Sequence, residues 1–297
     1  MCQEQLQSAA RLCATLNVKL MPLFEAIVLG IVQGLTEFLP ISSTAHLAVI
    51  PWLLGWKDPG LAFDIALHVG TLVAVLVYFF RDWVQVLAQG FGMNAGHDSA
   101  LKKNRNLLWL MVVGTIPAGI AGLLFQHKAE TTLRSPYIIA ATAIGIGLLM
   151  WYADYNGRRQ KDIGHVSWGD AISIGLAQAL AVVPGVSRSG ITITAGLFSG
   201  LDRRTAARFS FLLSTPVIAA AAAKDFWDLL KQEGGIAPDM RSAFLVGIVV
   251  SAITGCLVIR FFMNYLRERS LSVFVYYRII FGIIVIALAI FFRFNGG

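Results

Sequence analysis

Four polar residues have the types and spacing needed for phosphoryl chemistry. Glu37, Ser43 and His46 lie close together in the first half of the chain, and Arg188 is the only charged residue of the segment 171–201. A carboxylate and an imidazole can move protons, a serine hydroxyl can act as a nucleophile, and a guanidinium group matches a pair of phosphate oxygens. The glycines and serines around Arg188 leave backbone amides that can bind an anion. These residues predict a phosphoryl-transfer site.

The elements that position these residues must lie in a lipid bilayer. Of the 297 residues, 57% are hydrophobic and 14% are charged, whereas a soluble domain has roughly 25% charged residues. The mean hydropathy is +0.69. Six apolar segments are long enough to cross about 30 Å of hydrocarbon, and they are 61–80, 107–125, 137–153, 205–223, 243–259 and 273–292. The sequence therefore predicts an all-α polytopic membrane protein with six transmembrane helices.

Two further apolar regions, 22–56 and 172–201, are interrupted by proline, glycine and serine. They resemble each other, because GIVQGL followed by LPISS in the first corresponds to GLAQAL followed by VPGVS in the second. We interpret both as re-entrant helical hairpins. Irregular backbone at membrane depth is tolerated only where protein or a wet cavity covers it, so the two tips are expected to meet. The serines of both tips, with the helix N-termini behind them, would then surround an anion near the midplane.

The repeat also predicts the organisation of the chain. One hairpin and three spans in each half give an odd number of crossings, which places the halves in opposite orientations as an inverted repeat. The expected parts are a tail or extension at 1–21, a first repeat at 22–153, a cytoplasmic linker at 154–170 and a second repeat at 171–297. Lys and Arg are more frequent in the loops on one side, which predicts that both termini lie outside.

Other features exclude some classes of function. The net charge of +7 does not indicate a nucleic-acid partner, because Lys and Arg lie in short loops between apolar segments. Cys2, Cys13 and Cys256 form neither a disulfide framework nor a zinc motif. Asp64 and His68 lie four residues apart and could support the site or carry protons. An interfacial aspartate with a locally bonded histidine explains them equally well, so they are left out of the catalytic set.

The segments QGLTEFLPISSTAH (33–46) and PGVSRSGIT (184–192) together resemble the undecaprenyl-diphosphate phosphatase family of the bacitracin-resistance type. The resemblance runs from about residue 21 to the C-terminus. It implies hydrolysis of undecaprenyl diphosphate to undecaprenyl phosphate and inorganic phosphate, which recycles the lipid carrier of cell-wall synthesis and confers bacitracin resistance. It also implies an inverted-repeat fold in the bacterial plasma membrane, with the site open toward the outer face.

Residue by residue, the resemblance marks Glu37, Ser43, His46 and Arg188 as the catalytic set. It implies a divalent cation, Mg²⁺ or Ca²⁺, with Glu37 as the protein ligand beside diphosphate oxygens and water. Gln33 stands where some family members have a glutamate, which argues against a mechanism with two carboxylates one helical turn apart. The residues expected to bind substrate are Gln33, Ser42, Thr44, Gly185, Ser187, Ser189 and Thr192.

For the nucleophile, we favour Ser43 activated by His46, with Glu37 orienting the histidine or holding the metal. Attack by His46 itself, or by a water that Glu37 activates, stays open. An apolar groove for the prenyl chain is also expected, although no stretch of sequence measures its length.

A transporter of lipid phosphates or anions is the main alternative, since secondary transporters are also built from inverted repeats with broken helices. Such a protein would not need Glu37 and His46 to handle protons. A structural scaffold explains neither Glu37 in an apolar segment nor the repeated tip motif. The expected partners are the polyprenyl diphosphate lipid and the bilayer, and a homo-oligomer is left open.

Overall fold

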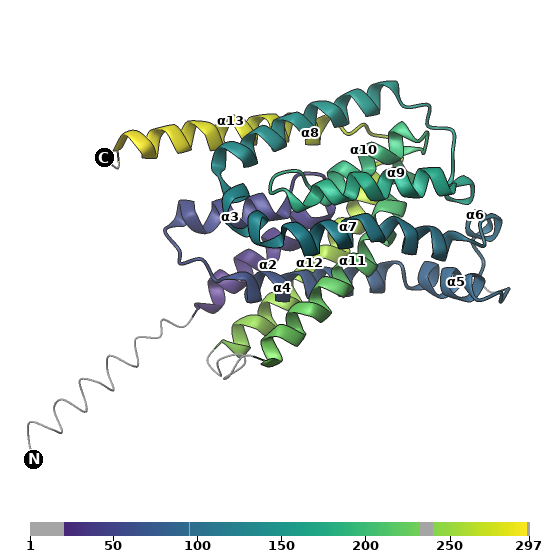
Figure 1. Ribbon diagram of the computed structural model, residues 1–297, viewed down its shortest axis with the longest axis horizontal. Helices are drawn as coiled ribbons and strands as arrows, with labels where there is room; N and C mark the ends of the chain where they lie inside the picture. Colours follow the sequence, from purple (N-terminus) through teal and green to yellow (C-terminus); the bar gives the residue numbers. More distant parts are fainter. Residues whose placement is uncertain (1–20, 95, 232–239, 296–297) are drawn as a thin grey trace, which may run out of the picture.

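The computed structural model describes residues 21–94, 96–231 and 240–295, and this part of the chain is helical without any strand (Figure 1). The predicted N-terminal tail falls outside the described residues except for Met21. The main helices are α2 (Leu23–Phe38), α3 (Ser43–Leu54), α4 (Leu61–Tyr78), α5 (Phe80–Gly90), α6 (Ser99–Lys103), α7 (Leu107–Glu130), α8 (Pro136–Asn156), α9 (Trp168–Ala179), α10 (Arg188–Phe198), α11 (Arg203–Lys231), α12 (Arg241–Tyr265) and α13 (Ser272–Asn295).

Long apolar helices make this a polytopic membrane protein. Within the described ranges, five helices are long and apolar enough to cross a bilayer, and they lie in α7, α8, α11, α12 and α13. The sixth predicted span is α4, which continues into α5 after a bend of 77°. Large apolar side chains such as Leu123 and Leu257 are exposed on these helices, as expected where lipid is the solvent.

The two predicted hairpins are helices broken at a proline. α2 and α3 are separated by a turn that contains Pro40, while Pro184 lies in the turn between α9 and α10. Proline lacks an N–H donor and disfavours helical backbone in the residue before it, so Pro40 ends α2 and Pro184 ends the 3-10 turn Leu180–Val182 that follows α9. In Figure 1, α3 lies toward the end of the molecule where α13 terminates, whereas α9 and α10 lie closer to α5 and α6.

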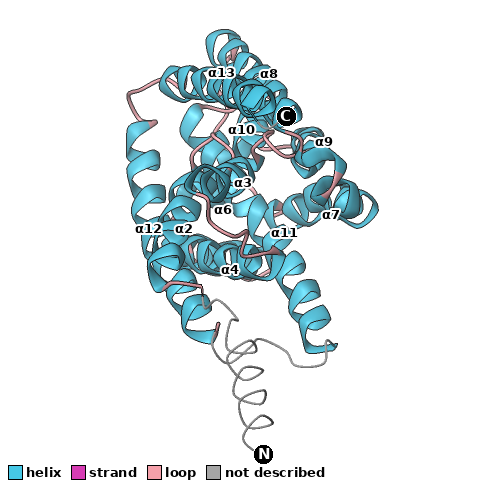
Figure 2. Cartoon of the chain, turned by 90° about the vertical axis from the view of Figure 1, so that its left-hand side faces the viewer, coloured by secondary structure: helices cyan, strands magenta, loops and turns pink. Residues whose placement is uncertain are grey.

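Helices from both halves of the chain pack against one another. α12 lies against α2 and α4, α13 packs on α8, and α7 packs on α9. Figure 2 shows α12 beside α2 and α4, and α13 beside α8. The contact of α12 is close because glycines face it. A Cβ on Gly34 would lie 2.9 Å from the carbonyl oxygen of Ser251, and one on Gly70 would collide with the carbonyl oxygen of Ile248. This packing fixes α2 and α4, the helices that carry Glu37 and His68.

Candidate active site

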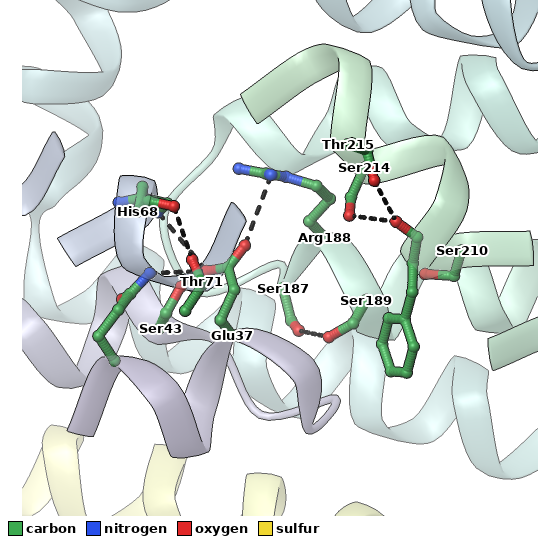
Figure 3. A network of polar contacts seen from close by, with 12 residues as sticks. Glu37, Ser43, His68, Thr71, Ser187, Arg188, Ser189, Ser210, Ser214 and Thr215 are labelled. Atoms are coloured by element: carbon green, nitrogen blue, oxygen red, sulfur yellow. Dashed lines mark hydrogen bonds and ion pairs between the residues drawn. The ribbon is translucent and has the colours of Figure 1, made fainter. Parts of the chain in front are cut away.

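Glu37 is the centre of a buried polar cluster in the last turn of α2 (Figure 3). Its Oε2 accepts hydrogen bonds from Ser43 Oγ at 2.7 Å and from Gln33 Nε2 at 3.2 Å. His68 Nε2 lies 3.5 Å from the same oxygen, and Arg188 Nη1 lies 3.5 Å from Oε1. A carboxylate is disfavoured at the negative end of a helix and in an apolar interior. Three of these partners, Ser43, His68 and Arg188, come from other helices, and the guanidinium group of Arg188 compensates the charge.

The two hairpin tips place Ser43 and Arg188 on either side of Glu37. Each is the first residue of its helix, α3 or α10. The residues before them, Ser42 and Ser187, have φ values of 78° and 69°. Positive φ is unfavourable for a residue with a Cβ, so packing must hold both serines in this conformation. The tips therefore direct two helix N-termini, which favour negative charge, toward the same region.

The expected contact between the tips is confirmed. Ser189 Oγ, on the second hairpin, donates a hydrogen bond of 3.1 Å to the carbonyl oxygen of Leu39 on the first. The other tip hydroxyls bond within their own hairpins, Ser42 with Thr44 at 3.2 Å and Ser187 with Ser189 at 3.3 Å. The tips thus touch through one serine and through the ion pair at Glu37.

His46 does not lie where the sequence interpretation put it. Its Nδ1 is 2.7 Å from the carbonyl oxygen of Ser42, and its Nε2 is 2.7 Å from the hydroxyl of Tyr277. A carbonyl only accepts, so Nδ1 carries a proton, while the Tyr277 hydroxyl can donate to Nε2. The ring also stacks on Phe281 with a centroid distance of 4.5 Å. The predicted pairing of His46 with Ser43 is not found, because the Ser42 carbonyl and Tyr277 of α13 occupy the two ring nitrogens of His46 and Ser43 bonds Glu37 instead.

His68 is the histidine that reaches Glu37. Its Nδ1 lies 2.7 Å from the carbonyl oxygen of Asp64, as the local-bonding interpretation required, but its Nε2 points to the carboxylate. The spacing of Asp64 and His68 was a usable signal. The sequence could not show which face of α4 meets the first hairpin.

A cavity of about 350 Å³ adjoins this cluster. Its polar lining consists of Thr44, Asp64, His68, Arg134 and Arg188. Arg134, from the turn between α7 and α8, also lies 3.7 Å from Asp64. Two guanidinium groups facing one cavity favour an anionic ligand.

Three residues expected to bind substrate make contacts that hold the site in place. Gln33 is fully buried and orients Glu37. Gly185 has a φ of 89°, and a Cβ there would collide with Thr142, so only glycine fits this turn. Thr192 Oγ1 donates to the carbonyl oxygen of Arg188 and lies 2.6 Å from Ser210 Oγ, which directs it to α11.

Arg278 on α13 was not anticipated, yet it joins both tips. Only 1% of it is exposed, and its guanidinium group donates to carbonyl oxygens alone. Nη1 reaches Pro40 at 3.1 Å, and Nη2 reaches Gly185 at 2.9 Å and Val186 at 3.1 Å. Nε and Nη2 also bond carbonyls of α8. One buried guanidinium group therefore links the two hairpin tips to each other and to α8.

Replacing Arg278 is expected to loosen both tips. Arg278→Leu leaves several buried carbonyls unpaired, at a cost of about 1–3 kcal/mol each. The midpoint of thermal unfolding in detergent should fall markedly, with partial recovery in Arg278→Lys, which keeps the charge and some donors. Arg260→Leu, an exposed position on α12, serves as the control. An unchanged midpoint in Arg278→Leu would contradict this role.

The site around Glu37 offers few protein oxygens that could bind a divalent cation. Among the described residues, no group of three His, Cys, Asp or Glu side chains could hold a metal. Beside Glu37, however, the buried Oε1 of Gln33 has no hydrogen-bond partner in the structure. Mg²⁺ commonly binds through one or two protein oxygens and takes its other ligands from water and substrate phosphates. Glu37 and Gln33 are compatible with a cation held in this way.

Apolar spanning helices, two broken helices that meet, and a buried carboxylate bonded to a serine and an arginine define an integral membrane protein with an anion site. The sequence model of the family described as bacitracin resistance protein BacA matches residues 26–284. This chain belongs to that family, and the resemblance inferred from the two motifs is confirmed.

Relatives match along nearly their whole length. A protein of Moorella thermoacetica named undecaprenyl-diphosphatase is 47% identical over 267 residues, which cover 90% of this chain and 98% of that protein. One of Thermodesulfovibrio yellowstonii with the same name is 50% identical over 273 residues, 91% of this chain and 98% of that protein. The undecaprenyl-diphosphatase 2 of Stutzerimonas stutzeri is 49% identical over 276 residues, 90% of this chain and 98% of that protein.

Proposed function

We propose that this chain is a membrane phosphatase that hydrolyses undecaprenyl diphosphate to undecaprenyl phosphate and inorganic phosphate. The observation that carries the proposal is the bonding of Glu37 to Ser43 and Arg188 at the edge of a cavity with two guanidinium groups. The names of the relatives support the substrate. In the cell, the product would re-enter cell-wall synthesis, and its supply would confer bacitracin resistance.

The geometry favours Glu37 as the base for Ser43. Ser43 Oγ attacks the terminal phosphorus while its proton passes to Glu37 Oε2, the atom it already bonds. The bond from that phosphorus to the bridging oxygen breaks, and undecaprenyl phosphate leaves. Water then cleaves the phosphoserine and restores Ser43. Arg188 and the N-termini of α3 and α10 stabilise the charge that develops on the transferred group.

We further propose that Mg²⁺ or Ca²⁺ assists this reaction, with Glu37 and Gln33 as its protein oxygens. Such a cation would neutralise charge on the diphosphate. Removing it with a chelator should lower turnover by about a hundredfold, the effect typical of losing a group that stabilises developing charge. Phosphate release is measured before and after the chelator, and Mg²⁺ or Ca²⁺ should restore it. Full turnover in the chelator would refute the cation.

The decisive test of the function is phosphate release from undecaprenyl diphosphate by detergent-purified protein, with Glu37→Ala as the control. Release that the control abolishes supports a phosphatase with Glu37 in its site. A folded protein that releases no phosphate with any cation would instead favour the lipid-phosphate transporter.

We also propose an inverted repeat of 22–153 and 171–297 in the bacterial plasma membrane, with the site facing outward. The support is the matching backbone of Ser42 and Ser187 and the pairing of α2 with α12 and of α9 with α7. In a variant without native cysteines, Thr44→Cys in the cavity should react with an impermeant maleimide on intact cells. Asn94→Cys, exposed near α5, should react only after permeabilisation. The reverse pattern would refute the orientation.

A further inference from the structure

An apolar groove of about 380 Å³ runs between α7 and α11. Small residues make it, chiefly Ala118, Gly119 and Gly122 on α7 and Ala220 on α11. A Cβ built on Gly119 or on Gly122 would meet no atom within 4 Å. The glycines therefore do not serve close helix packing. They leave space along the surface of α7.

The groove continues directly from the cavity beside Glu37. Ala129, Val182 and Ala221 line both spaces. From Ala129 to Thr115, which also lines the groove, α7 rises by about 20 Å at 1.5 Å per residue. A ligand whose anionic head lies at Arg188 can thus extend along α7 without leaving the protein surface.

We propose that this groove binds the polyprenyl chain of the substrate. The inference rests on the proposed function and adds the path of the tail. A phospholipid acyl chain could also enter an apolar groove, but it lacks a terminal diphosphate to bind in the connected cavity. The bilayer is as apolar as the groove, so burial alone gives the tail little advantage over lipid. What the groove supplies is a fixed path that aligns the terminal phosphorus with Ser43.

The groove can be filled without disturbing the cavity. In Gly119→Leu and Gly122→Leu, the new side chains enter the open space. We expect kcat/KM for undecaprenyl diphosphate to fall by about tenfold or more, because small misplacements of a reacting group are costly. For isopentenyl diphosphate, whose five-carbon tail is too short to follow α7 from Ala129 to Gly122, about 10 Å away, kcat/KM should stay nearly unchanged. Gly145→Leu is the matched control, since Gly145 is exposed on α8 and also has no atom within 4 Å of a built Cβ.

The outcomes test the binding of the tail in the groove separately from the proposed phosphatase activity. Equal losses with both substrates, or no loss with either, would overturn the tail path while leaving the phosphatase in place. If the wild-type protein hydrolyses neither substrate, the proposed function fails, and a photoactivatable polyprenyl monophosphate then tests the groove without turnover. Crosslinks to α7 and α11 that Gly122→Leu reduces support the tail path. Crosslinks confined to other helices overturn it.

Discussion

Arg188→Ala is expected to lower kcat/KM for undecaprenyl diphosphate by about 10³-fold or more, since even one lost donor to a developing oxyanion costs 10²–10³-fold. Arg188 starts α10, lines the cavity and pairs with Glu37 at 3.5 Å. It is thus paired with the carboxylate that bonds the proposed nucleophile. Its removal leaves Glu37 with less compensation and the diphosphate without its main cation.

Two further variants make this result specific. Arg188→Lys keeps the charge without the planar fork and should recover only part of the loss. Arg134→Ala removes the other guanidinium group of the cavity, which also pairs with Asp58, and should cost much less. All three proteins should be extracted and should elute from a sizing column like the wild type. Near-normal turnover in Arg188→Ala would exclude the phosphate contact.

Ser43→Ala separates attack by Ser43 from attack by a water that Glu37 activates. If Ser43 attacks phosphorus, kcat should fall by more than about 10³-fold, since the loss of a true nucleophile is among the largest effects known. If Glu37 activates a water instead, removing the hydroxyl only frees Oε2, and the loss should stay within about tenfold.

Ser42→Ala is the matched control for that experiment. Ser42 precedes Ser43 in the same turn, but its hydroxyl bonds Thr44 and not Glu37. If Ser43 attacks phosphorus, the loss in Ser42→Ala should be far smaller than the loss in Ser43→Ala. A phosphorylated Ser43 detected by mass spectrometry after a rapid quench would give direct evidence for the serine, while a large loss in both variants would point to damage of the turn.

The sequence predicted the features that depend on local composition. Long apolar segments identify the spans, and Pro40 and Pro184 mark the two helix breaks that the structure contains. The gathering of Glu37, Ser43 and Arg188 was anticipated because the motifs place these residue types on two converging tips, whereas the direct contacts of Glu37 with Ser43 and Arg188 were not. The roles assigned to these residues stay predictions until the variants are measured.

What the sequence did not reveal depends on packing between distant helices. Whether His46 or His68 reaches Glu37 is decided by α13, whose Tyr277 binds His46, and by the face that α4 presents to the first hairpin. Arg278 gave no signal either. Its partners are backbone carbonyls far away in the chain, and every residue type has a carbonyl.

The close contact of α12 with α2 and α4 constrains how the chain is made. Gly34 and Gly70 emerge from the ribosome long before Ser251 and Ile248, the residues they pack against. Because translation proceeds at about 5–20 residues per second, α12 follows α2 and α4 only after a time on the order of ten seconds or more. During that time Glu37 already lies in an inserted apolar segment without its later partner Arg188. The first half is therefore a natural client for membrane insertases, and a chain cut before α12 should be degraded rather than accumulate as a stable half.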